Sequence, residues 1–206
     1  MPKILTTKHI SAALEELITS CSEKLVLLSP YWQLSNSLLN RLKDASQRGV
    51  QITIVYGKEE LKQAELEKIH KIKNAKIYFC ENLHAKCYYN ENCAIISSMN
   101  LHEFSEKNNI ELGIALFKGA DQTLYNAIIT ETEYIINKES VPEYGHCIRC
   151  GCEIPFDPTH PMCYNCYQIW NNYKNPVYTE TFCHKCGESC EDIYICSPLC
   201  ENCTDE

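Results

Sequence analysis

Four Cys-x2-Cys pairs in the last third of this chain constrain its fold more than any other feature. They form two groups of four thiols: Cys147, Cys150, Cys163 and Cys166, and Cys183, Cys186, Cys200 and Cys203. Twelve residues separate the pairs of the first group, and thirteen separate those of the second. Four thiolates at this spacing can surround a zinc ion tetrahedrally. The sequence therefore predicts two structural zinc ions per chain.

The two groups also resemble each other. Cys150-Gly151 corresponds to Cys186-Gly187, and Pro161-Met-Cys163 corresponds to Pro198-Leu-Cys200, at offsets of 36 and 37 residues. Such offsets indicate an internal duplication. Glycine after the first pair suits the tight turn that wraps sulfur around a metal. We therefore expect tandem zinc-ribbon-like modules at 143–175 and 179–206.

Some ligand assignments stay open at this stage. Three cysteines are left over, namely Cys152, Cys190 and Cys196. Three histidines lie close to the two groups, namely His146, His160 and His184. Because imidazole is also a zinc ligand, a histidine could replace a cysteine in either site.

Charge and cysteine content divide the chain at the same place. Residues 1–142 hold 16 Lys and Arg against 17 Asp and Glu, whereas residues 143–206 hold 3 against 10. Four of the 15 cysteines precede this boundary. Pro142 and Gly145 supply the punctuation typical of a linker. We predict two domains, 1–142 and 143–206.

The compartment is inferred from the same cysteines. Fifteen cysteines favour metal sites over disulfides if the chain is cytoplasmic, where thiols stay reduced. The sequence has no apolar stretch of about 18 to 20 residues and no apolar run of signal-peptide type after Lys3. We expect a soluble, cytoplasmic protein with no membrane contact.

The first domain alternates between helical and strand patterns, which predicts an α/β layered sheet. Helices are expected over 10–21, 35–48, 58–72 and 119–138. Strands are expected over 24–30, 50–56, 75–80 and 110–117, with two further strands between Lys86 and Met99.

Four polar side chains in this domain form a pattern that suits phosphodiester chemistry. His84 and Lys86 are two residues apart, as are Ser98 and Asn100, so each pair would project from one face if it lies on a strand. A turn near Asn90–Asn92 would fold the two strands together as a hairpin. An imidazole can attack phosphorus while an ammonium and an amide offset charge on the non-bridging oxygens. No catalytic metal is required for this chemistry.

These residues resemble the signature of the phospholipase D superfamily, H-x-K-x4-D-x6-G-S-x-N. Ser97 stands where the signature has glycine, and ten residues rather than eleven separate it from Lys86. The aspartate is replaced, with Asn90 or Glu91 near its place. The resemblance covers most of residues 1–140. It implies a layered α/β/α sandwich, and it implies that Glu111 hydrogen-bonds the nucleophilic histidine.

The resemblance also implies an assembly. Catalysis in the superfamily uses two histidines, and this chain has one copy of the motif. Family members of this kind place one site at the interface of a homodimer. His84 of one subunit would form a phosphohistidine, and His84 of the other would act as general acid. His70 and His102 are the alternative acids within one chain.

Substrate and accessory roles remain as alternatives. A nuclease is the first hypothesis, by analogy with small single-motif members of the superfamily. An inactive dimer that binds nucleic acid or protein is the second, and a phospholipase is the third. The acidic tail opposes phosphate binding, so the zinc modules suggest a structural or protein-contact role. Five aromatic residues could form that contact or fill a small core: Tyr164, Tyr167, Trp170, Tyr173 and Tyr178.

Overall fold

The computed structural model describes residues 1–57, 61, 63–73, 75–102 and 109–204, with the backbone alone for Gln63 and His102. The chain divides into two compact units, Met1–Ser140 and Val141–Glu206. Among the helices of the described ranges, not one has the length and apolar character to cross a membrane.

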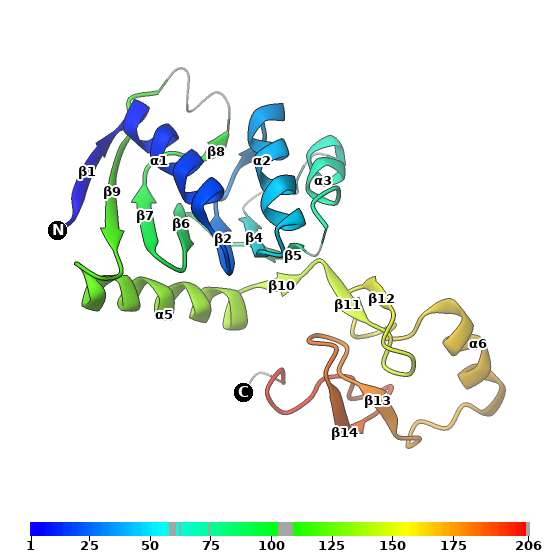
Figure 1. Cartoon of the computed structure of the whole chain (residues 1–206). Coiled ribbons are helices and arrows are strands. Elements are labelled where there is room, and N and C mark those ends of the chain that lie inside the picture. Colours follow the sequence, from blue (N-terminus) through cyan, green and yellow to red (C-terminus); the bar gives the residue numbers. More distant parts are fainter. Residues whose placement is uncertain (58–60, 62, 74, 103–108, 205–206) are drawn as a thin grey trace. The chain divides into compact units, whose positions relative to one another are not determined.

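The first unit is built on one mixed sheet (Figure 1). Its strands are β1 (Lys3–Thr6), β2 (Lys24–Leu28), β4 (Gln51–Gly57), β5 (Ala75–Cys80), β6 (Cys87–Asn90), β7 (Cys93–Ser97) and β9 (Leu112–Phe117). Their order across the sheet is β1-β9-β7-β6-β2-β4-β5. Strands β2, β4 and β5 are parallel, whereas β6, β7, β9 and β1 continue the sheet with antiparallel pairing. Two short segments, β3 (Trp32–Gln33) and β8 (Leu101–His102), pair with each other beside the sheet.

Helices cover both faces of this sheet. One face packs against α1 (Thr7–Ser20), α2 (Asn36–Gln47) and α3 (Gln63–Ile69). The other face packs against α5 (Gln122–Lys138) through Tyr125 and Ile136. The predicted layered α/β/α architecture is confirmed.

Local sequence explains where these elements start and stop. Four apolar residues at helical spacing are buried on α1: Ile10, Leu14, Leu17 and Ile18. Ser35 caps α2, because its hydroxyl accepts a hydrogen bond from the Leu38 N–H at 3.2 Å. Gly49 ends the same helix with φ of 88°, a conformation that glycine adopts without strain.

Some predicted elements differ from the structure. The helix expected over 58–72 spans Gln63–Ile69, and residues 58–60 and 62 lie outside the described ranges. Beyond it the chain forms turns, with the Ile72 N–H bonded to the Ile69 carbonyl at 2.9 Å. Strand β1 was not predicted, because its four residues alternate weakly and depend on pairing with β9.

The second unit is small and contains little regular structure. After β10 (Val141–Pro142) it has two hairpins and one helix. The hairpins are β11 (Tyr144–His146) with β12 (Glu153–Pro155), and β13 (Glu180–Phe182) with β14 (Ser189–Ile193). Helix α6 (Tyr164–Tyr173) lies between them in sequence. A single core gathers apolar side chains and cysteines from both hairpin regions.

Candidate active site and metal centres

The two halves of the sequence motif meet at one end of the sheet. Strands β6 and β7 pair antiparallel, with Cys87 opposite Ile96. The Ser97 N–H then donates a hydrogen bond to the Lys86 carbonyl at 3.2 Å. The His84–Lys86 and Ser98–Asn100 segments therefore leave the sheet at the same end of these two strands.

The motif residues do not lie on the strands themselves, which corrects the sequence interpretation. His84 and Lys86 precede β6, and Ser98 and Asn100 follow β7. The Ser98 N–H still donates to the Leu112 carbonyl at 3.0 Å, so pairing with β9 continues one residue beyond β7. One residue further along the chain, the Met99 carbonyl accepts a hydrogen bond from the Tyr88 hydroxyl at 2.7 Å.

Gly57 leaves room for the turn that precedes His84. Gly57 ends β4, and a Cβ at this position would lie 2.1 Å from the Cys80 carbonyl oxygen and 2.6 Å from Leu83 Cβ. The absence of a side chain thus allows the turn after β5, in which the Leu83 N–H donates to Cys80 at 3.1 Å. Leu83 is buried at 3% exposure, so this turn anchors the segment that carries His84.

The motif supplies an accessible imidazole and several other polar side chains. His84 is exposed and Lys86 is half-buried, with the Lys86 Nζ donating to the His84 carbonyl at 2.8 Å. The Ser98 hydroxyl hydrogen-bonds the Glu111 carboxylate, which also accepts a bond from Asn109 Nδ2 at 3.2 Å. An accessible imidazole, with an ammonium, a hydroxyl and a carboxylate on its own and neighbouring segments, can support nucleophilic attack on a phosphodiester.

The serine in the glycine position of the signature has a structural explanation. Ser97 pairs across the sheet with Gly113, and a Cβ on Gly113 would lie 2.9 Å from Ser97 Cβ. The glycine on β9 therefore leaves the space that the Ser97 side chain occupies. The Ser97 hydroxyl accepts a hydrogen bond from the Met99 N–H at 3.1 Å, which fixes the start of the turn toward Asn100.

Glu91 occupies the place of the signature aspartate, five residues after Lys86. Its carboxylate accepts hydrogen bonds from the Ser22 N–H at 2.8 Å, the Ser22 hydroxyl at 2.9 Å and the Lys24 N–H at 3.3 Å. Burial alone would raise the pKa of Glu91, but these hydrogen bonds outweigh it and leave the pKa below its ordinary value. The carboxylate ties the hairpin to the start of β2, so it is a structural anchor.

Replacing this anchor should destabilise the first unit in a pH-dependent way. Glu91→Gln should lower the free energy of unfolding by about 1.5–3 kcal/mol at pH 7, because hydrogen bonds to a charged group are lost. Since the folded pKa is lowered, this stabilisation is complete above the ordinary glutamate pKa of about 4.3 and disappears as the pH falls through the folded value. Urea unfolding of wild type and Glu91→Gln, at pH 7 and in acid, measures this difference in the free energy of unfolding. The exposed neighbour gives the control Glu23→Gln, and a wild-type advantage that persists in acid would contradict the anchor role.

Two aromatic residues follow β2, and one of them is buried in the interior. Trp32 is buried at 5% exposure, and its Nε1 donates to the Ser29 carbonyl at 2.7 Å, so interior packing accounts for it. Tyr31 is half-buried. His70 is exposed just after α3, and the side chain of His102 lies outside the described part of the structure.

The second unit contains the two expected cysteine clusters. The four sulfur atoms of each cluster lie within 4.8 Å of one another, and each set could hold a metal ion. Cys150 and Cys163 Sγ are 3.9 Å apart, as are Cys186 and Cys200 Sγ. Four sulfurs about 2.3 Å from a tetrahedral ion lie about 3.8 Å apart, so the geometry fits.

Two glycines shape the loops around these clusters. Gly151 and Gly187 have φ of 71° and 75°, the left-handed conformation expected for the turn after the first cysteine pair. Their N–H groups donate to the carbonyls of Cys147 and Cys183 at 2.8 and 2.9 Å. The predicted role of these glycines is confirmed.

The duplicated modules interlock with an approximate twofold relation. The residue before the first cysteine of each module donates its N–H to the residue after the first cysteine of the other. His146 donates to the His184 carbonyl at 2.8 Å, and Phe182 donates to the Ile148 carbonyl at 2.8 Å. Each glycine after the first pair also faces the other module, since a Cβ on Gly187 would lie 2.8 Å from the His146 ring. The modules therefore form one body.

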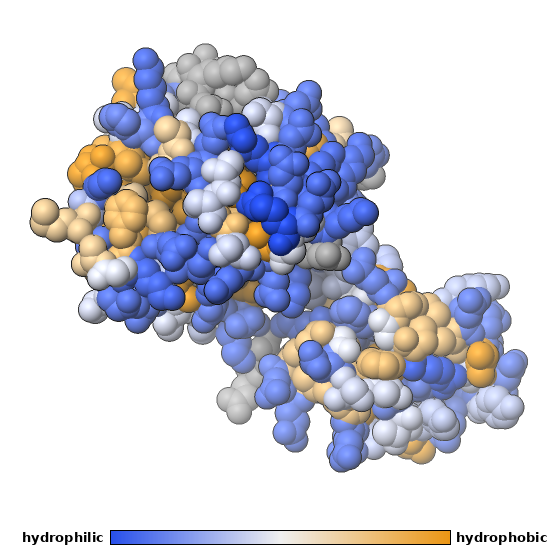
Figure 2. Space-filling view, in the orientation of Figure 1, coloured by the Kyte–Doolittle hydropathy of each residue, from blue (hydrophilic) through white to orange (hydrophobic). Residues whose placement is uncertain are grey.

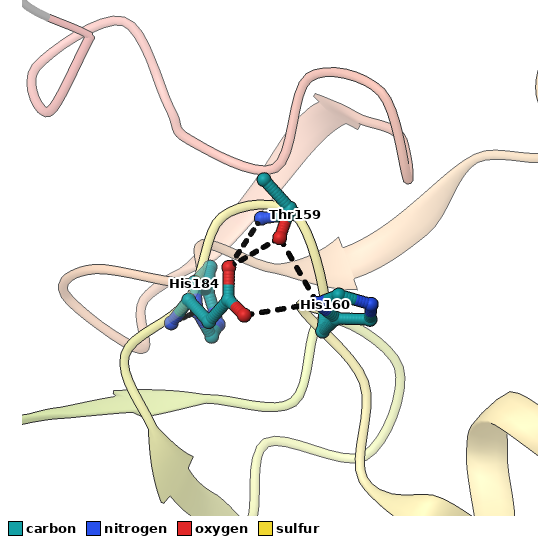
Figure 3. Close-up of polar contacts among 4 residues, drawn as sticks. Thr159, His160 and His184 are labelled. Atoms are coloured by element: carbon teal, nitrogen blue, oxygen red, sulfur yellow. Dashed lines mark hydrogen bonds and ion pairs between the residues drawn. The ribbon is translucent and has the colours of Figure 1, made fainter.

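The nearby histidines have structural partners. His184 is buried, its Nδ1 bonded to the His146 carbonyl at 2.6 Å and its Nε2 accepting from the Asp157 N–H at 2.9 Å. Figure 3 shows the adjoining loop, where the Asp157 carboxylate accepts hydrogen bonds from Thr159 and His160 that lower the pKa of Asp157. Both ring nitrogens of His184 are thus engaged away from the thiols.

Residues 14–135 match the family described as "Cardiolipin synthase, PLD-like domain". Comparison with curated proteins gave no match. Among solved structures, the phospholipase D family member Nuc from Salmonella typhimurium superposes with a TM-score of 0.58 at 16% identity, covering 69% of this chain and 98% of Nuc.

Two further structures share the fold. NucT from Helicobacter pylori gives a TM-score of 0.58 at 14% identity, with 69% of this chain and 98% of NucT covered. Phosphatidylserine synthase from Haemophilus influenzae gives 0.56 at 15% identity, with 68% and 39% covered. The family match spans more than half of the sequence and coincides with the layered unit that carries the motif. This chain therefore belongs to the phospholipase-D-like family.

Proposed function

We propose that this protein is a homodimeric nuclease that cleaves phosphodiester bonds through His84, without a catalytic metal. The observation that carries the proposal is that the two motif halves meet at the same end of β6 and β7, where the Ser97 N–H is bonded to the Lys86 carbonyl. The exposed His84 imidazole is accessible to a substrate, and Lys86 and Ser98 lie on segments beside it. A phosphodiesterase of the phospholipase D type agrees with the family match.

The chemistry follows from these groups. A ring nitrogen of His84 attacks phosphorus and forms an N–P bond, while the bond to the leaving oxygen breaks and that oxygen takes a proton from His84 of the partner. The partner imidazole then removes a proton from water, which attacks phosphorus and releases His84. The Lys86 ammonium and Asn100 offset charge on the non-bridging oxygens. We assign Ser98 and Glu111 to positioning, and the prediction that Glu111 hydrogen-bonds the imidazole remains part of this proposal.

An exposed apolar sheet face supports the dimer. Ile4, Ile114 and Ile96 are cross-strand neighbours on β1, β9 and β7, and they lie on the face opposite α1. Ile4 and Ile96 are 68% and 42% exposed, and Leu112 beside them is 62% exposed. Apolar side chains also reach the surface near β1 in Figure 2. Monomeric proteins rarely expose contiguous apolar area of this kind, and a second copy would cover it.

Nucleic acid is the substrate class we favour, in a cytoplasmic protein. The fold matches two small Nuc-type structures over 98% of their length, which supports the single-motif nuclease branch. A phospholipase would have to engage a lipid surface. An inactive dimer that binds nucleic acid or protein is the competing possibility, and a cleavage assay separates it from an enzyme.

The proposed chemistry predicts cleavage that resists chelation. Labelled single- and double-stranded DNA and RNA should be cut by the purified chain after brief EDTA treatment, because histidine and lysine do the work that bound metal ions do in two-metal nucleases. His84→Asn should lower the rate at least 100-fold. Strict dependence on added magnesium would contradict the mechanism, and binding without cleavage would favour the inactive dimer.

For the second unit we propose two structural zinc ions and a protein contact. The clusters consist of thiols, which suit zinc. Tyr164 and Tyr173 on α6 are 76% and 82% exposed, and Tyr178 is 55% exposed, so these rings do not fill the core. Arg149 is engaged by Glu180 in a two-point ion pair, which leaves little basic surface for phosphate. An exposed aromatic surface on an acidic unit favours a protein partner over nucleic acid.

A further inference from the structure

Two polar atoms of the first unit are buried without a hydrogen-bond partner. Across the described ranges, Asn100 Oδ1 and Arg41 Nε are the only side-chain nitrogen or oxygen atoms in this state. Leaving such a group unpaired in the interior costs about 1–3 kcal/mol, so native proteins seldom do it without a reason. Both residues line the same pocket. An acceptor and a donor left unpaired at one pocket point to a ligand.

The pocket lies between α1, α2 and the segment Met99–Leu101, and its volume is about 130 Å³. That is room for more than a single water molecule, whose share of liquid volume is about 30 Å³. Four apolar side chains contribute to its wall: Leu14, Leu38, Met99 and Leu101. Polar side chains supply the rest of its lining: three serines, Gln33, Glu15, Arg41 and Asn100. A pocket with both apolar and polar walls suits a ligand that has an apolar face and a polar edge.

The pocket adjoins the proposed catalytic centre. Asn100 belongs to the motif and follows Ser98 by two residues. The next residue, Leu101, donates its N–H to the Ser29 hydroxyl at 3.1 Å, at the end of β2. β8 also pairs with β3, which brings Gln33 beside the pocket. The pocket therefore shares Asn100 with the proposed catalytic centre.

The Arg41 guanidinium can donate a hydrogen bond through Nε even while its Nη2 is engaged in an ion pair. Its Nη2 contacts Glu15, and the two side chains are 40% and 54% exposed, so this pair is a surface ion pair of modest strength. The buried Nε remains available. Asn100 supplies the matching acceptor. A ligand that presents one acceptor and one donor along a flat edge would pair both atoms.

We propose that this pocket binds one unpaired nucleobase of the substrate, next to the phosphodiester that is cleaved. The inference rests on the proposed nuclease function and specifies its substrate as single-stranded. Each nucleobase carries a donor beside an acceptor on its pairing edge, and single-stranded recognition uses that edge together with contacts to the ring face. In a duplex the pairing edge is occupied by the complementary strand. The apolar wall contacts the ring, while Arg41 and Asn100 bind its edge.

The test measures binding separately from cleavage. Full-length His84→Ala protein is titrated with labelled oligothymidylate, with an abasic strand of the same length, and with a duplex. Oligothymidylate should bind about tenfold more tightly than the abasic strand, since only it has a base for the pocket. Arg41→Met should remove most of that difference, and it should weaken the abasic strand and the duplex only by the amount that loss of one positive charge causes.

Lys43→Met is the matched control, because Lys43 lies on α2 with the same charge but does not line the pocket. It should weaken all three ligands alike, by charge alone. Circular dichroism and thermal unfolding of each variant establish that it is folded. Equal affinity for the base-containing and abasic strands, or equal weakening of both by Arg41→Met, would overturn the pocket assignment while leaving cleavage intact. Failure to bind or cut any nucleic acid would overturn the nuclease function, and the pocket assignment with it.

Discussion

Mixed dimers of wild-type and His84→Ala chains should be nearly inactive. If one active site uses His84 from both subunits, a single substitution removes either the nucleophile or the general acid. Loss of one member of a cooperating catalytic pair costs most of the rate, so residual activity should be at most about 1% of wild type. Independent sites in each chain would instead leave about half of the activity. The two mechanisms therefore differ by at least about fiftyfold in the same measurement.

The experiment requires dimers of defined composition. Coexpression of equal amounts of the two chains under different tags gives about half mixed dimers if association is random. Purification through both tags isolates them for a rate measurement. A mixed dimer of wild type with His160→Ala is the control. His160 is exposed in the second unit, and this variant has the same histidine-to-alanine replacement. It should keep nearly full activity.

Activity near half would reject the shared site. A second acid within the same chain would then be needed, and His102 and His70 would be the residues to replace. Sedimentation gives the mass of the protein in solution and so tests whether the chain is a dimer or a monomer. For a dimer, Ile96→Lys should lower the measured mass, because a charge would enter the apolar face and weaken association. For a monomer, the substitution should leave the mass unchanged.

Much of this arrangement is encoded locally and could be predicted. Apolar spacing on α1, the Ser35 cap and the left-handed Gly49 each depend on residues within a few positions. The cysteine pairs are equally local, since the turn after the first pair of each module depends on one glycine. The layered fold then follows from alternating elements. Features of this kind are visible in a single sequence.

The rest depends on contacts between residues far apart in the chain. Glu91 anchors Ser22, 69 residues away, so its role could not be read from the motif alone. Ser97 is accommodated because Gly113 lies opposite on β9, a pairing that only the sheet defines. The position of Ser98 has the same origin, because it is set by pairing with Leu112 on β9. Sequence periodicity carries no information about such partners.

Removing one ligand from either cysteine cluster should empty both metal sites. The two modules exchange backbone hydrogen bonds through His146 and Phe182 and share one core, in which Cys147 and Cys183 are fully buried. Binding of a structural metal supplies about 10–16 kcal/mol in small zinc domains, far more than a core of this size provides by burial. Loss of one ion therefore leaves the other module without the partner that positions its loop.

The measurement is zinc per chain, by elemental analysis of protein purified under reducing conditions. Wild type should contain about two ions, and Cys183→Ser should contain well under one. Cys196→Ser is the control, because this exposed cysteine lies outside both clusters, and it should keep about two. A stable content of one ion in Cys183→Ser would show that the modules fold independently. Since the motif residues all belong to the first unit, folded Cys183→Ser protein should cleave with wild-type chemistry even though its second unit is open to proteolysis.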